Sequence, residues 1–106
     1  MKYRNNIQMK QYMIEIELPQ TLTEEFVRLI PQQRAKINEL MGRGEIFTYS
    51  LSADRSRLWV IAKANSEKAV MDLLAKFPLI DHMRPEITEL AFYMSEPVGM
   101  PKLIFN

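Results

Sequence analysis

Hydrophobic and polar residues alternate in four short segments of this chain, and the alternation predicts four β-strands. In "QYMIEIEL" (11–18) every second residue is apolar, while two carboxylates, Glu15 and Glu17, share the opposite face. A period of two is typical of a strand that buries one face. The other predicted strands are 45–51, 57–64 and 86–93, and the segment "SADRS" joins the second and third as a hairpin.

Two segments with apolar residues at helical spacing lie between these strands. The first begins near Thr21, because Thr21 and Glu24 have the spacing of a capping box, and it ends near Gly42 and Gly44. Pro31 lies inside it, and we expect a kink or a break there because proline lacks the N–H that a helix interior needs. The second helix begins at Ser66 and stops before Pro78.

The resulting order, β-α-β-β-α-β, predicts an α+β ferredoxin-like domain. Each helix has only one apolar stripe, so both must cover the same face of a four-stranded antiparallel sheet. The exposed face is too apolar for solvent alone, and we expect a homodimer or larger ring that pairs sheet to sheet and encloses a barrel-like cavity. The chain is divided into a tail (1–10), the domain (11–94) and a C-terminal extension (95–106). The open face would carry Glu15, Glu17, Trp59, Ile61, Ile87, Ala91 and Tyr93.

Composition and charge narrow the possible partners and cofactors. The 14 basic and 13 acidic residues nearly cancel, which argues against a nucleic-acid partner. The chain has no cysteine and one histidine, so it lacks the ligands for a thiolate or multi-imidazole metal site, and we expect no cofactor. No apolar run approaches the roughly 20 residues that span a bilayer, and the first ten residues do not resemble a signal peptide. We therefore expect a cytoplasmic protein that binds a small molecule, with no membrane partner.

Four polar positions are candidates for proton transfer. Glu15 and Glu17 share a strand face, and a pair of neighbouring carboxylates is a candidate for a general base. The plainer interpretation is a solvated or salt-bridged strand. His82 is of the residue type most used for proton transfer at neutral pH, although a loop histidine after Pro78 is commonly just exposed. Tyr93 would supply a phenol at the end of the last strand.

The hairpin and its strands supply candidates for substrate binding. Arg55 and Arg57 offer guanidinium groups that suit an anionic substrate, although a charged hairpin tip also keeps a protein soluble. Trp59 and Tyr49, with Tyr93, would line an aromatic pocket, although aromatic residues on a sheet commonly serve a core or an interface.

Three stretches of the sequence resemble the muconolactone isomerase family: "ELPQTLTEE" (17–25), "ELMGRGE" (39–45) and "LLAKFPLIDHMRPEITEL" (73–90). The resemblance covers about residues 11 to 94. It implies a ferredoxin-like fold that dimerises sheet to sheet and a cofactor-free shift of a double bond in a carboxylated unsaturated lactone. In such a reaction a general base moves a proton, hydrogen-bond donors hold the dienolate oxygen, and a cation holds the carboxylate.

The sequence departs from the family pattern at polar positions. Gln33 stands where the family has an acid, Tyr93 where it has a histidine, and His82 where it has a tyrosine. Residues 48–51 replace a run of His, Leu, Trp and Arg, whereas Arg55 and Glu15 match basic and acidic positions. A different substrate is therefore expected.

The leading hypothesis is a cofactor-independent isomerase that acts by proton transfer on a small carboxylated or oxygenated cyclic molecule. Glu15 or Glu17 would be the base, and His82 and Tyr93 would be proton donors or oxyanion partners. Arg57 or Arg55 would hold an anionic group of the substrate. One alternative is a cofactor-free quinol-type monooxygenase with an aromatic pocket. The other is a non-catalytic module that uses the fold for small-molecule binding or assembly.

Overall fold

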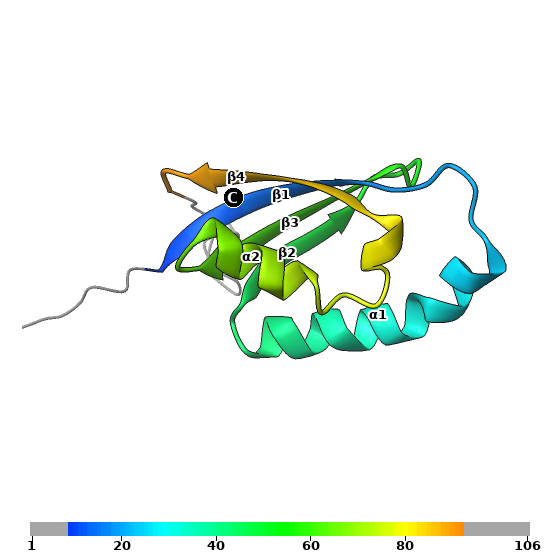
Figure 1. Ribbon diagram of the computed structural model, residues 1–106, viewed down its shortest axis with the longest axis horizontal. Coiled ribbons are helices and arrows are strands. Elements are labelled where there is room, and N and C mark those ends of the chain that lie inside the picture. The colour runs from blue at the N-terminus through cyan, green and yellow to red at the C-terminus, as the bar shows by residue number, and fades with distance from the viewer. Residues whose placement is uncertain (1–8, 93–106) are drawn as a thin grey trace, which may run out of the picture.

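The computed structural model describes residues 9–92, and their elements follow the expected β-α-β-β-α-β order (Figure 1). The predicted extension 95–106, Tyr93 and most of the tail 1–10 lie outside the described residues. The elements are β1 (Lys10–Glu17), α1 (Glu24–Gly42), β2 (Ile46–Leu51), β3 (Arg57–Ala64), α2 (Glu67–Leu74), the 3₁₀ turn η1 (Ile80–His82) and β4 (Arg84–Leu90).

The four strands form one antiparallel sheet in the order β2-β3-β1-β4, and Figure 1 shows both helices on the same side of it. This confirms the α+β ferredoxin-like prediction. The predicted position of Ile87 on the open face is wrong. Ile87 pairs with Ile14, whose side chain is fully buried on the helix side, so Ile87 faces the helices and not the open face. The apolar residues of β4 alternate weakly, and its pairing with β1 decides its orientation.

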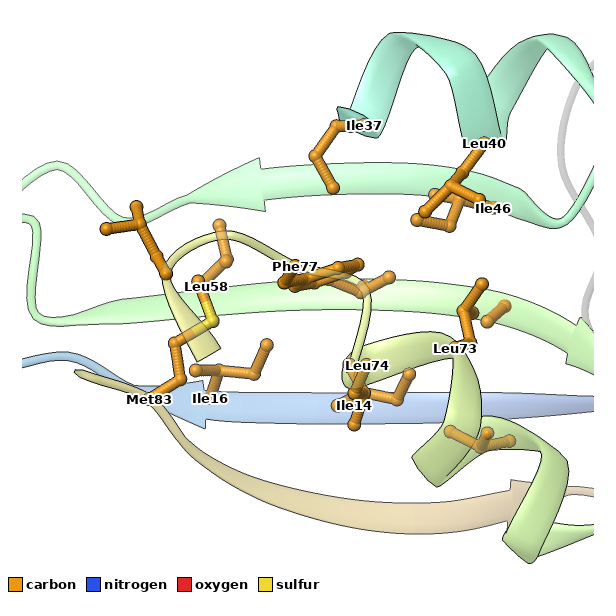
Figure 2. Packing of buried hydrophobic residues seen from close by; sticks show 14 of the residues in the cluster. Ile14, Ile16, Ile37, Leu40, Ile46, Leu58, Leu73, Leu74, Phe77 and Met83 are labelled. Carbon is orange, nitrogen blue, oxygen red and sulfur yellow. The ribbon is translucent and has the colours of Figure 1, made fainter. Parts of the chain in front are cut away.

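The core lies between the sheet and the helices, as Figure 2 shows for Ile14, Ile16, Leu58, Leu74 and Phe77. Each of these side chains is at most 3% exposed. Burial of one such side chain contributes about 1.5–3 kcal/mol, so this layer holds the helices on the sheet. The same layer continues into the segment 77–83, which carries the chain from α2 to β4.

Helix α1 begins later than its sequence prediction, and it has no break at Pro31. Its N-cap is Thr23, whose Oγ1 accepts a hydrogen bond from the Phe26 N–H at 3.1 Å, so the helix starts after Thr21. The helix runs through Pro31 without a break. Pro31 is exposed, and buried residues of the apolar stripe, Phe26 and Ile37 among them, hold both halves on the sheet. Their packing outweighs the hydrogen bond that proline removes.

Helix α2 begins where the sequence places it. The Ser66 Oγ accepts a hydrogen bond from the Ala69 N–H at 3.1 Å. Neither helix in the described part of the chain is long and apolar enough to cross a membrane.

Candidate functional site

A pocket of about 190 Å³ opens on the helix side of the sheet, between α1, the β2–β3 hairpin and the segment that leads into β4. It is smaller than the roughly 300–1,000 Å³ of drug-sized sites, so it suits a molecule of about one ring. Its walls are mostly apolar, and its polar groups come from four residues. The apolar lining includes Leu22, Phe26, Ile30, Leu58, Leu79 and Met83, and the polar lining is Gln33, Arg34, Tyr49 and Arg55.

Gln33 and Tyr49 form the polar wall of this pocket. Gln33 comes from the buried stripe of α1 and is 3% exposed. Its Oε1 accepts a hydrogen bond from the Leu79 N–H at 3.0 Å, and its Nε2 donates to the Tyr49 hydroxyl oxygen at 3.2 Å. Tyr49 pairs with the fully buried Val60 in the sheet register, which places its side chain on the helix-covered face. The pair therefore joins α1, β2 and the segment before β4.

Burial raises the pKa of Tyr49 above its ordinary value of 10, and the hydrogen bond from Gln33 opposes only part of that rise. The phenol is consequently neutral at physiological pH. A neutral phenol donates a hydrogen bond or a proton and does not act as a base. This wall of the pocket is suited to holding an oxygen that gains negative charge during a reaction.

Arg55 brings a positive charge to the pocket from the tip of the β2–β3 hairpin. Its φ of 65° lies in the left-handed region, which costs about 1–2 kcal/mol for a residue with a Cβ. Such strain is typical of positions retained for a function. Arg34 of α1 supplies a second guanidinium to the pocket. The two cations are suited to a carboxylate.

The hairpin tip that presents Arg55 is organised by Asp54. One carboxylate oxygen, Oδ1, accepts hydrogen bonds from the Ser52 hydroxyl at 2.8 Å, the Ser56 hydroxyl at 2.7 Å and the Ser56 N–H at 3.0 Å. The hydrogen bonds from Ser56 and then that from Ser52 lower the pKa of Asp54 to about 2. The Arg55 N–H also donates to the Ser52 carbonyl at 2.9 Å. These contacts hold the turn in the conformation that Arg55 adopts.

The other predicted site residues of the central strands lie on the open face, across the sheet from this pocket. Glu15 pairs with Trp59 and Glu17 pairs with Arg57, and all four alternate with residues buried on the helix side. The guanidinium of Arg57 donates a hydrogen bond to the Glu15 carboxylate. The sheet thus separates Glu15 and Glu17 from Tyr49 and Arg55, and the base role of these carboxylates stays a prediction that concerns another surface.

His82 lies in η1 next to the pocket but does not line it. Its half-buried imidazole packs edge-to-face on the Phe26 ring, with ring centres 5.4 Å apart and planes at 77°. Phe26 itself lines the pocket, so His82 supports the wall from behind. The proton-transfer role of His82 stays a prediction. The role proposed for Tyr93 concerns a residue outside the described part of the chain.

Two pocket residues, Gln33 and Arg34, had no role assigned from the sequence. Gln33 carried a signal, because a polar residue on an apolar helix stripe needs a buried partner. Its partners are a backbone N–H 46 residues away and a hydroxyl 16 residues away, which no local pattern identifies. Arg34 carried no such signal. Within residues 9–92, no three metal-ligating side chains lie close enough together to hold an ion.

Comparison with known proteins agrees with the fold and with the sequence motifs. A search of curated proteins finds no match. The family model described as muconolactone delta-isomerase matches residues 11–96, which include every described strand and helix except the first residue of β1. Because this match spans most of the chain, the protein belongs to the muconolactone delta-isomerase family.

Proposed function

We propose that this protein is a cofactor-independent isomerase that binds a small carboxylated or oxygenated cyclic molecule in the pocket under α1. The observation that carries the proposal is the buried pair of Gln33 and Tyr49 at the wall of an otherwise apolar pocket. Membership of the muconolactone delta-isomerase family supports a proton shift as the reaction. The neutral Gln33–Tyr49 pair favours a substrate whose oxygen is neutral until the reaction begins.

The proposed roles follow from the chemistry of each group. The Tyr49 hydroxyl donates a hydrogen bond to a carbonyl oxygen of the substrate, and this bond strengthens as the oxygen gains negative charge. Gln33 holds the phenol in place through its Nε2. Arg55 and Arg34 bind the carboxylate of the substrate, and the apolar walls exclude water from the reacting carbons.

A second function, binding without turnover, is favoured by a specific observation. An isomerase needs a proton acceptor, and none of the described residues that line the pocket is a carboxylate or a histidine. Glu15 and Glu17 occupy the opposite face of the sheet. The two functions share one binding site and differ in whether the proton moves.

The test of the proposal is turnover of carboxylated, unsaturated five-membered lactones. Turnover is measured as the change in ultraviolet absorbance when the double bond shifts. We expect turnover by the wild type and a loss of about 10²-fold in kcat for Tyr49→Phe, the cost of removing one oxyanion donor. Tyr12→Phe is the matched control, because Tyr12 is buried outside the pocket lining. Calorimetric binding with no turnover of any lactone would select the binding function.

We also propose that the open face of the sheet pairs with the same face of a second copy. Trp59 is a large apolar side chain, and it is 37% exposed on that face. Light scattering coupled to gel filtration measures the assembly. Trp59→Glu is expected to lower the mass to that of one chain, whereas Met71→Glu, a change at an exposed apolar residue of α2, is expected to leave it unchanged. An unchanged mass for Trp59→Glu would contradict the pairing.

A further inference from the structure

The side-chain amide of Gln33 has only one orientation that satisfies its surroundings. The Leu79 N–H points at one end of the amide from 3.0 Å, and an N–H donor requires an acceptor there. Both residues are buried, Gln33 at 3% and Leu79 at 4% exposure, so water does not substitute for that acceptor. The oxygen of the amide therefore faces Leu79, and its NH₂ group faces Tyr49.

This orientation decides the direction of the hydrogen bond to Tyr49. The Gln33 Nε2 has hydrogens and no lone pair to offer, so the phenol oxygen is the acceptor of the 3.2 Å contact. The hydrogen of the phenol then has to point elsewhere. Within residues 9–92, Gln33 is the hydrogen-bonding partner of the Tyr49 hydroxyl, and Tyr49 lines the pocket. The phenol hydrogen is therefore available to a molecule in the pocket.

We infer that Gln33 is the specificity-determining residue of this pocket: it makes Tyr49 present a hydrogen-bond donor and so selects molecules that bring an oxygen acceptor to that wall. The inference rests on the proposal that the pocket under α1 binds a small molecule. It adds the kind of group that the molecule must carry next to Tyr49. That group is a hydrogen-bond acceptor, such as a carbonyl or an ionised oxygen, and not a donor such as an amine.

A single substitution of nearly the same shape should reverse this polarity. In Gln33→Glu, a carboxylate accepts from the Leu79 N–H and also from the Tyr49 hydroxyl. The phenol hydrogen is then drawn toward α1, and a lone pair of its oxygen faces the pocket. The pocket of this variant is expected to prefer a donor over an acceptor, with no change in the apolar walls.

Two probes of similar size, 4-formylbenzoate and 4-aminobenzoate, test the inference by isothermal titration calorimetry at pH 8. Both carry a carboxylate for the arginines, and they differ in whether the opposite group accepts or donates a hydrogen bond. One hydrogen bond corresponds to about three- to tenfold in Kd, so the wild type is expected to bind the formyl probe tighter by that factor. In Gln33→Glu the preference is expected to reverse, and in Tyr49→Phe the two probes are expected to bind about equally.

Gln32→Glu is the matched control, because it adds the same charge at an exposed position of α1 outside the pocket lining. Its preference is expected to stay that of the wild type. The inference is overturned by a wild-type preference for the amino probe, by an unchanged ratio in Gln33→Glu, or by failure of both probes to bind the wild type. If Gln33→Glu does not fold, Gln33→Leu takes its place: it removes the amide that orients the phenol, and the preference for the formyl probe is expected to be lost, whereas an unchanged preference overturns the inference.

The outcome separates this inference from the proposed function. A reversed preference without turnover of any lactone would retain the role of Gln33 and remove the isomerase proposal. Turnover that depends on Tyr49, together with an unchanged probe ratio in Gln33→Glu, would retain the isomerase and remove the role of Gln33.

Discussion

Removing Gln33 is expected to destabilise the fold far more than removing the Tyr49 hydroxyl, although both changes delete the same 3.2 Å hydrogen bond. The substitutions are Gln33→Leu and Tyr49→Phe, each close to the wild type in volume. They differ in what they leave behind. Gln33→Leu leaves the buried N–H of Leu79 without its acceptor, whereas Tyr49→Phe leaves an amide hydrogen of Gln33 at the wall of a pocket.

The expected magnitudes follow from that difference. A buried donor left without a partner costs about 1–3 kcal/mol, and Leu79 is 4% exposed, so Gln33→Leu should lower the free energy of unfolding by about 2 kcal/mol. The amide hydrogen that Tyr49→Phe leaves unpaired is able to bond water in the open pocket. The loss of that bond is therefore expected to cost about 0.5–1 kcal/mol.

Urea denaturation measures the difference. All variants are compared at one protein concentration, because the proposed self-association would make the apparent stability depend on it. We expect midpoints in the order wild type, Tyr49→Phe, Gln33→Leu, with unchanged slopes. A Gln33→Leu variant within about 0.5 kcal/mol of the wild type, or one more stable than Tyr49→Phe, would refute the orientation of the Gln33 amide and the role built on it.

Three further predictions concern the hairpin and the open face. Arg55→Gly is expected to raise the free energy of unfolding, measured in urea, by about 0.5 kcal/mol, because the relief of backbone strain at φ 65° exceeds the entropy that glycine adds to the unfolded chain. The same change is expected to weaken the binding of 4-formylbenzoate in calorimetry. Asp54→Ala is expected to lower stability at neutral pH. Because the pKa of Asp54 falls from 3.8 to about 2 on folding, its contribution is present above pH 3.8 and is lost as the pH falls through about 2. Melting temperatures of wild type and variant should therefore converge at the acidic end, and a constant gap would contradict this. Glu15→Gln is expected to change lactone turnover less than twofold if the pocket under α1 is the site, and a loss like that of Tyr49→Phe would return the base role to Glu15.

The parts of the fold that depend on neighbouring residues could be predicted from the sequence. Strand β3 occupies the predicted 57–64, and α2 begins after the predicted cap at Ser66, because alternation and capping are properties of a few adjacent residues. Pro31 shows the limit of such reasoning. Its local effect opposes the helix, and only the packing of the α1 stripe on the sheet shows that the helix continues.

The location of the candidate site depends on which side of the sheet has the pocket. The alternation of residues along a strand does not show which side that is. Alternation correctly groups Glu15 with Glu17, but it does not show that the cavity lies across the sheet, beside Tyr49 and Arg55. Gln33 was visible as a polar residue on an apolar stripe, and its partners became known only when α1, β2 and the segment before β4 were brought together. The sequence by itself determined the order of the elements and the buried faces of β1 and the helices, because these depend on spacing along the chain, whereas pairing with β1 decided the buried face of β4. The polarity of the pocket was decided by the tertiary structure, because a buried hydrogen bond takes its direction from whichever distant donor packs against it.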